Sequence, residues 1–273
     1  MADDLTLPTG DLMRGKRGLV MGVANHNSIA WGIAKQLAAQ GAELALSYIP
    51  PVERRVRPLG ESIGVKHFVE ADVGSDESME AAFKAVGEAF DGKIDFLVHA
   101  IAFADKSQIA GSFVENTTRE GFRLALDISA YSFVDAARRA SKLMPDGGSM
   151  ITLTYLGSER VIPNYNVMGV AKAALEASTR YIARDLGPKG VRVNAISAGA
   201  IRTLSLAGIA DGRKMIAQGR AFSALKEDTS VEGVAGCALW LLSDLGRSTT
   251  GEVVHVDAGF HMMGLPDEIP GEA

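Results

Sequence analysis

Apolar residues follow two patterns along the chain: short continuous runs alternate with longer segments in which they recur about every four residues. Continuous runs rich in β-branched residues are typical of strands buried in a parallel sheet, and the longer repeat is typical of amphipathic helices. The predicted strands are 18–21, 44–48, 67–71, 96–100, 150–154, 192–196 and 253–256. Seven strands separated by helical segments predict an α/β fold, a Rossmann-type doubly wound sheet of seven mostly parallel strands with helices on both faces.

The first two predicted strands flank a segment, 29–40, that has a clear helical repeat. Ile29, Ile33 and Leu37 recur at intervals of four residues. This spacing places their side chains on one face of a helix, and Gly41 follows where a helix can end. The regular part of the chain therefore opens with a β-α-β unit.

The chain length and its uniform pattern predict one domain over 1–273. With 273 residues and 47% hydrophobic content the chain can build a substantial core. No linker rich in proline, serine or glycine and no repeat of about 20 to 50 residues interrupts the series. Three parts are less regular: an N-terminal arm at 1–14, the segment 198–228 and a polar tail at 266–273.

Charge and residue usage exclude several classes of protein. The formal net charge of -5 gives no basic surface for binding nucleic acid or an anionic membrane, and favours small-molecule partners. Cys237 is the only cysteine, so an intrachain disulfide or a thiolate metal cluster cannot form, and the five histidines lack ligand spacing, which predicts no metal. The acidic N-terminus and the lack of an apolar run of about 18 residues predict a cytoplasmic protein.

The loop after the first predicted strand is a candidate cofactor site. Gly22 allows a sharp turn, and Ser28 can cap the following helix, whose N-terminus offers free amides and a positive dipole. These features suit a pyrophosphate group. A tight strand-to-helix connection would have the same composition, and the loop departs from the G-x-G-x-x-G pattern, so both interpretations stay open.

Two further strand ends are compatible with a dinucleotide. Asp72 follows the third predicted strand, where its carboxylate can accept a hydrogen bond from an adenine amino group or can cap the next helix. The segment from His99 to Ala104 is built mainly of small and apolar residues, as a backbone lying flat along a cofactor requires. A buried loop without a ligand would look similar.

Tyr165 and Lys172 are the strongest candidates for chemistry. Seven residues make about 1.9 helical turns, so the two side chains would share one helix face, about 10.5 Å apart along the axis. A phenol donates a hydrogen bond at neutral pH, and a nearby ammonium stabilises developing negative charge. The spacing alone is near chance in a chain with five tyrosines. Tyr155, just after the fifth predicted strand, adds a third polar group at the edge where such folds bind ligands.

The segment around these residues carries a resemblance that extends over most of the chain. It reads YLGSERVIPNYNVMGVAK from Tyr155 to Lys172, and matching motifs lie at 118–122, 127–129, 190–199, 201–204 and 251–257. These motifs resemble those of the bacterial NADH-type enoyl-[acyl-carrier-protein] reductase family, a divergent branch of the short-chain dehydrogenases/reductases. Only the two termini and 49–66 fall outside the resemblance.

The resemblance implies an activity and roles for particular residues. The family transfers a hydride from NADH to the β-carbon of a trans-2-enoyl thioester on acyl carrier protein, in type II fatty acid biosynthesis, and forms homotetramers. It implies that Tyr165 stabilises the enolate, that Lys172 holds the nicotinamide ribose and that Tyr155 lines the site. Cofactor-contact positions of the family fall on Gly22, Ser28, Ile29, Ile49, Asp72, Val73, Ile101, Lys172, Ile201, Arg202, Thr203, Leu204 and Ser205. Ala104 falls on an acyl-substrate position, together with Tyr155 and Tyr165.

Two alternative functions share these features in part. Ketoacyl and other carbonyl reductases of the same fold place lysine four residues after the tyrosine and serine thirteen before it, where this chain has Gly169 and Thr152. A non-catalytic dinucleotide sensor would have no need of Tyr165 with Lys172. NADH is favoured over NADPH, although Arg54 or Arg55 could bind a 2′-phosphate.

The irregular segment 198–228 is predicted to cover the substrate. Its basic residues are Arg202, Arg213, Lys214, Arg220 and Lys226, against one acid, Asp211, between 201 and 226. On an acidic protein this excess is a candidate landing patch for an acidic carrier, and it is equally compatible with an ordinary solvated helix face. The apolar residues Ala207, Ile209, Met215 and Ile216 could cover the acyl chain.

Overall fold

The computed structural model describes residues 8–207 and 212–265, and in them seven strands form one sheet. The strands are β1 (Arg17–Met21), β2 (Glu43–Tyr48), β3 (His67–Glu70), β4 (Phe96–His99), β5 (Gly148–Thr154), β6 (Val191–Ala198) and β7 (Val253–Val256). Their order is β3-β2-β1-β4-β5-β6-β7, and every neighbouring pair is parallel. The predicted fold class is confirmed, with a sheet that is parallel throughout its described strands.

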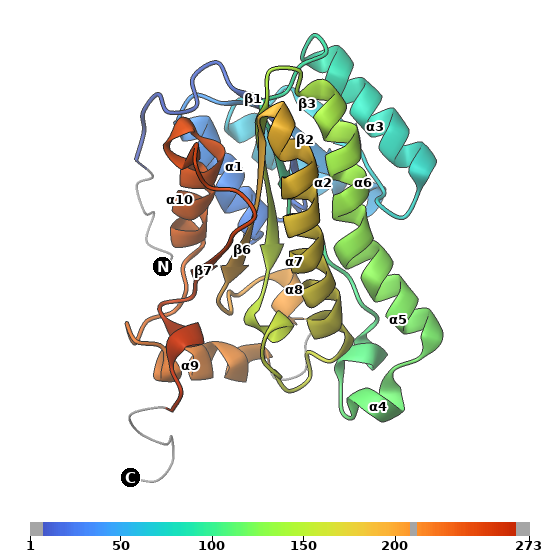
Figure 1. Ribbon diagram of the computed structural model, residues 1–273, viewed down its shortest axis with the longest axis vertical. Helices are drawn as coiled ribbons and strands as arrows, with labels where there is room; N and C mark the ends of the chain where they lie inside the picture. Colours follow the sequence, from blue (N-terminus) through green and yellow to red (C-terminus); the bar gives the residue numbers. More distant parts are fainter. Residues whose placement is uncertain (1–7, 208–211, 266–273) are drawn as a thin grey trace.

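Helices cover both faces of the sheet (Figure 1). One face carries α1 (Ile29–Ala39), α2 (Glu53–Ser62) and α10 (Val231–Leu242), and the other carries α3 (Asp76–Ala89), α6 (Ser132–Ala140) and α7 (Val167–Leu186). Helix α5 (Arg119–Leu126) packs in a smaller cluster with Tyr165 and the start of α7. Side chains alternate between the two faces along each strand, so that Val20 belongs to the first core cluster and Leu19 and Met21 to the second. The short helices α4 (Phe113–Asn116), α8 (Leu204–Ala207) and α9 (Gly212–Phe222) lie beyond the carboxyl ends of the strands.

The sheet has a topological switch point between β1 and β4. The chain builds outward from β1 to β2 and β3, then returns to place β4 on the other side of β1. Met21 and His99 are paired in register at the carboxyl ends of these two strands. The connections that follow leave in opposite directions, which opens a crevice where parallel α/β sheets bind ligands.

The N-terminal segment contacts the end of α1. Met13 is fully buried in the core cluster beneath α1, and its amide donates a 2.9 Å hydrogen bond to the carbonyl of Gln40. The side chain of Gln40 in turn donates to the carbonyl of Pro8 at 2.7 Å. Residues 8–14 of the predicted arm thus contact the end of α1 through Met13 and Pro8, whereas 1–7 and the predicted tail at 266–273 lie outside the described residues.

Seven of the 14 strand ends match the prediction, and the other seven differ from it by one or two residues. β6 is the longest strand and continues to Ala198, so the segment predicted as irregular begins inside the sheet and contains α8 and α9. Within the described residues, no helix combines the length and apolar character needed to cross a membrane.

Candidate active site

A cleft of about 700 Å³ opens at the carboxyl ends of the strands, at the switch point. Its walls come from the loops after β1, β4, β5 and β6, from the start of α7 and from α8 and α9. The predicted site residues that line it are Gly22, Ser28, Ile29, Ile101, Ala104, Tyr155, Tyr165, Lys172, Ile201, Thr203 and Leu204. The structure thus brings together residues from both halves of the chain.

The loop after β1 requires glycine at its first position. Gly22 has a φ of 103°, and a Cβ there would lie 2.1 Å from the carbonyl oxygen of Ala100. The backbones of the loops after β1 and β4 are therefore in direct contact, and no residue larger than glycine fits at position 22. This contact brings the loop after β1 against Ala100, and both residues line the cleft.

The side chain of Ser28 is hydrogen-bonded to the backbone of the loop after β1. Ser28 occupies the predicted N-cap position of α1, although its side chain makes no capping hydrogen bond. Its hydroxyl instead accepts hydrogen bonds from the amides of Ala24 and Asn25, at 3.0 and 3.1 Å. Ile29 and Ala30, in the first turn of α1, face the cleft, where an anionic group can meet a helix N-terminus.

The loop after β4 is held by a residue that the sequence analysis missed. Ser129 is fully buried in a π-helical turn, Asp127–Tyr131, between α5 and α6. Its hydroxyl lies 3.0 Å from the amide nitrogen of Phe103, which donates to it, and 3.1 Å from the carbonyl oxygen of Phe103, which accepts from it. Ser129 thereby fixes the backbone of a loop that lines the cleft.

Two tyrosines meet edge to face beside the end of β5. The rings of Tyr155 and Tyr165 are 5.0 Å apart at an angle of 70°, a favourable aromatic geometry. Burial, and secondarily the charge of Asp257, raises the pKa of Tyr155 to about 12. Burial also raises the pKa of Tyr165 well above its ordinary value, with smaller contributions from Tyr155 and Glu176. Both hydroxyls are therefore protonated hydrogen-bond donors at neutral pH.

Tyr165 does not lie on the same helix as Lys172. Helix α7 begins at Val167, and Tyr165 occupies the preceding turn, where its carbonyl accepts a 3.0 Å hydrogen bond from the amide of Met168. The predicted placement on one helix face is wrong, because Asn164 and Asn166 take positive φ values that interrupt the helix. Tyr165 and Lys172 nevertheless line the same cleft.

Two glycines make room for the ring of Tyr165. A Cβ at Gly157 would lie 2.3 Å from that ring, and a Cβ at Gly169 would lie 2.6 Å from the carbonyl oxygen of Gly157. Gly169 is the position at which the carbonyl reductases described above have lysine. Here the packing of the turn against α7 leaves no space for a side chain at that position.

Lys172 is buried at the bottom of the cleft with 5% of its surface exposed. Its ammonium donates a 2.7 Å hydrogen bond to the carbonyl of Leu153 on β5. Burial lowers the pKa of Lys172 to about 8, and the charge of Glu176 opposes that shift. Lys172 therefore remains mostly protonated at neutral pH, and Glu176 is a second residue that the sequence analysis did not identify.

Several predicted cofactor contacts lie away from the cleft walls. Ile49 is 43% exposed after β2, and Arg202 is exposed beside α8. The carboxylate of Asp72 accepts a 2.9 Å hydrogen bond from the amide of Gly74, and the side chain that caps α3 is that of Ser75. Val73 also does not line the cleft, and the side chain of Ser205 lies outside what the structure describes.

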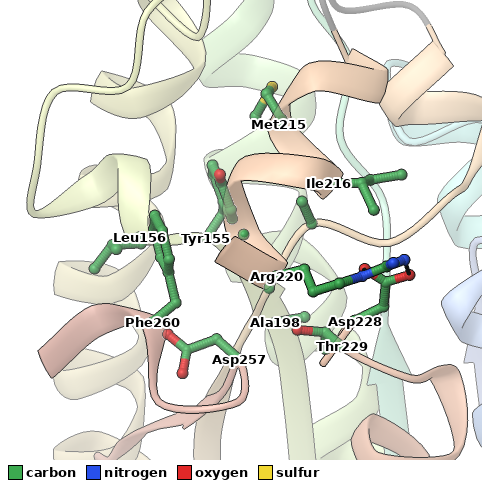
Figure 2. Close-up of a pocket in the computed structure, with 13 residues that line it drawn as sticks. Tyr155, Leu156, Ala198, Met215, Ile216, Arg220, Asp228, Thr229, Asp257 and Phe260 are labelled. Carbon is green, nitrogen blue, oxygen red and sulfur yellow. Dashed lines mark hydrogen bonds and ion pairs between the residues drawn. The ribbon is translucent and has the colours of Figure 1, made fainter. Parts of the chain in front are cut away.

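A smaller pocket adjoins the cleft beneath α9 (Figure 2). Tyr155, Met215 and the backbone segment 198–200 line both cavities. On the far side of the pocket, Arg220 forms an ion pair with Asp228 through hydrogen bonds of 3.0 and 2.5 Å. Asp228 lies just beyond the segment in which the basic excess was counted, so that excess is smaller in the folded chain than the sequence suggested.

The described residues contain no cluster of three or more histidine, cysteine or carboxylate side chains placed to hold a metal ion. The polar groups on the cleft walls include the phenols of Tyr155 and Tyr165, the ammonium of Lys172 and the backbone amides at the start of α1, and Asp105 and Lys106 also line the cleft. Such a set can bind a phosphorylated cofactor and stabilise negative charge that develops on a substrate oxygen.

Comparison with known proteins identifies close relatives. A family model described as "Enoyl-(Acyl carrier protein) reductase" matches residues 22–261. A protein of Rhizobium meliloti (strain 1021), named enoyl-[acyl-carrier-protein] reductase [NADH] 2, is 53% identical over 256 residues, which cover 93% of this chain and 95% of that protein.

Solved structures give the same result. The enoyl-(acyl-carrier-protein) reductase of Anaplasma phagocytophilum, crystallised in complex with NAD, superposes with a TM-score of 0.92 at 50% identity, covering 96% of this chain and all of that one. The Bacillus cereus enoyl-acyl carrier protein reductase, solved with NADP+ and an indole naphthyridinone, has a TM-score of 0.91 at 48% identity, covering 93% of this chain and all of that one.

Proposed function

The chain belongs to the enoyl-(acyl carrier protein) reductase family, and from this premise we propose that it reduces trans-2-enoyl thioesters on acyl carrier protein in type II fatty acid biosynthesis, with NADH as reductant. The observation that carries the proposal is the meeting of Tyr155, Tyr165 and Lys172 in one cleft at the switch point of the sheet. Two protonated phenols and an ammonium suit a reaction in which negative charge develops on a carbonyl oxygen.

The cleft fits a nicotinamide dinucleotide. Because Gly22 has no side chain, the loop after β1 can lie directly against Ala100. The N-terminus of α1 faces the cavity. We assign the cofactor to this region, held by Ser28, Ile29, Ile101, Lys172, Ile201, Thr203 and Leu204. Ile49, Asp72, Val73, Arg202 and Ser205 are proposed as further contacts by their family positions. NADH is the reductant in the names of several relatives, which supports its use here.

A nicotinamide held here would supply a hydride for the β-carbon of the enoyl thioester. The substrate would then become an enolate, whose oxygen carries the new negative charge until the α-carbon takes a proton from water. We assign Tyr165 as the donor to this oxygen, because burial keeps its hydroxyl protonated at neutral pH. Lys172 would contribute a positive charge at the cofactor ribose, and the ring of Tyr155 packs edge to face against that of Tyr165.

Helices α8 and α9 are proposed to cover the acyl chain. Leu204, Leu206 and Met215 from these helices line the cleft, as does Ala104 on the opposite side. Exposed basic residues nearby, Lys214 among them, are available to an acidic carrier protein. The chain therefore has an apolar cover next to a basic outer surface, as a carrier-bound fatty acyl substrate requires.

We also propose a cytoplasmic homotetramer. In support, β7 pairs with β6 alone in the described sheet and so leaves a strand edge open to a second copy. The ring of Trp240 on the neighbouring helix α10 is 37% exposed. Sedimentation of the purified protein tests this assembly, and a monomer at micromolar concentration would refute it.

The function is tested by following NADH oxidation with two substrates. A crotonyl thioester should be reduced and a ketoacyl thioester should not, since Gly169 stands where carbonyl reductases have lysine and has no space for a side chain. Reduction of the ketoacyl thioester would assign the chain to carbonyl reduction instead. NADH binding without reduction of either substrate would indicate a dinucleotide sensor.

A further inference from the structure

The buried face of α7 carries two charged side chains one turn apart. Lys172 and Glu176 are 5% and 6% exposed. Each is tied to a successive residue of β5: the ammonium of Lys172 donates to the carbonyl of Leu153 at 2.7 Å, and the carboxylate of Glu176 accepts from the hydroxyl of Thr154 at 2.5 Å. Leu153, Thr154 and Lys172 line the cleft, whereas Glu176 lies behind them.

Glu176 is a buried carboxylate with few partners. The hydroxyl of Thr154 donates its one hydrogen bond among the described residues, and none of those residues forms an ion pair with it. Burying a carboxylate is costly unless an opposite charge or several donors compensate. The charge that compensates it is that of Lys172, one turn away on the same helix.

The other titratable groups around Lys172 carry no charge at neutral pH. His99, at the end of β4, is held neutral because burial, reinforced by the charge of Lys172, lowers its pKa to about 3. Its ring nitrogens lie 3.2 Å from the hydroxyl of Thr152 and 2.9 Å from that of Ser132. Tyr155 and Tyr165, on the other side, have raised pKa values and stay protonated. Among these groups, Glu176 is the one whose charge opposes the lowering of the Lys172 pKa by desolvation.

We propose that Glu176, held by Thr154, is a positioning residue that keeps Lys172 protonated for cofactor binding at neutral and mildly alkaline pH. The inference rests on the proposed function, which places Lys172 at the nicotinamide ribose. Without the carboxylate, the carbonyl of Leu153 would still accept from Lys172, but none of the groups named here would supply a negative charge against the desolvation that favours loss of its proton.

The test is NADH binding by the full-length Glu176→Gln variant, measured by direct titration at pH 6 and pH 8. The amide keeps an oxygen for the hydroxyl of Thr154 and removes the charge. Loss of a unit charge one helical turn away should move the alkaline limit of Lys172 protonation down by about one to two pH units. NADH should therefore bind about tenfold more weakly than to wild type at pH 8, and within about twofold of wild type at pH 6.

Three further variants isolate the charge. Glu176→Asp retains the carboxylate and should restore binding at pH 8. Thr154→Val removes the donor to Glu176 and should shift the pH dependence in the same direction by a smaller amount. Glu88→Gln removes an exposed carboxylate from α3, far from the cleft, and should match wild type at both pH values.

Two results would overturn the proposal. One is weakening by Glu176→Gln that is equal at pH 6 and pH 8, which indicates a structural role, and the other is unchanged binding. Should that variant fail to fold, NMR titration of isotopically labelled Lys172 in wild type and Thr154→Val decides, with unchanged ionisation counting against the proposal. The NMR titration needs no cofactor, so it separates this inference from the proposed function, which fails if wild type does not bind NADH.

Discussion

The bottom of the cleft and its cover are built differently. Tyr165, Lys172 and Glu176 at the bottom are almost fully buried; Lys172 and Glu176 are hydrogen-bonded to β5, and the ring of Tyr165 packs against that of Tyr155. On the cover, Leu204 is 50% exposed, and Arg220 is held by an ion pair at the surface. Preorganised polar groups in a buried setting stabilise developing charge, whereas exposed short helices adapt to varied substrates. The bottom is therefore suited to chemistry and the cover to recognition.

The largest expected effect is at the bottom of the cleft. Tyr165→Phe removes the proposed donor to the enolate oxygen, and loss of one such donor costs about 10²–10³ in turnover. NADH affinity should survive, because the ring and its packing against Tyr155 remain. Steady-state rates with a crotonyl thioester, with NADH titration as control, measure both. Turnover near that of wild type would remove Tyr165 from the mechanism.

Lys172→Ala should act on cofactor binding. A charged hydrogen-bonding group contributes about 1.5–3 kcal/mol, so NADH should bind about 10- to 100-fold more weakly. Direct titration of NADH fluorescence measures this. An unchanged dissociation constant together with a lost rate would move Lys172 from cofactor binding to the chemical step.

Gly157→Ala tests whether turnover depends on the position of the Tyr165 ring. The added methyl group would overlap the ring, and such overpacking costs about 1–3 kcal/mol. Thermal unfolding should show a lower Tm, and turnover should fall by about tenfold because the hydroxyl is displaced. Gly236→Ala is a matched control, since a Cβ at that position in α10 meets no neighbouring atom. A full rate in Gly157→Ala would show that the ring has room to adjust.

The smallest expected effect is on the cover. Reversing the charges of Arg213 and Lys214 should raise the KM for a carrier-bound enoyl substrate about threefold to tenfold at low salt, because surface charges act mainly on encounter. The KM for a small crotonyl thioester should stay the same. Equal changes for both substrates would refute a carrier-docking role for this surface.

The fold and most of the cleft could be predicted from the sequence because each depends on local patterns. Continuous apolar runs marked the strands to within two residues at every end, and their alternation with helices set the parallel order. Gly22 and Tyr155 follow directly from the ends of β1 and β5, so locating those strands also located these residues.

Other features depend on contacts that the local sequence does not encode. Ser129 is 26 residues from Phe103, and Glu176 is 22 residues from Thr154, so neither hydrogen bond leaves a signature in a short window. Met13 belongs to a two-residue apolar pair with Leu12 in a polar stretch, and the end of α1 buries Met13 while Leu12 is 46% exposed. The turn at Tyr165 was missed because Asn164 and Asn166 reach positive φ without glycine, although asparagine is the residue that does so most readily.

The most direct test of the proposed chemistry follows the hydride itself. The protein is incubated with a crotonyl thioester and NADH that carries deuterium at the transferred position, and NMR of the butyryl product locates the label. Deuterium at the β-carbon is the expected result. Deuterium at the α-carbon, or a product without deuterium, would contradict hydride addition to the enoyl thioester in this cleft.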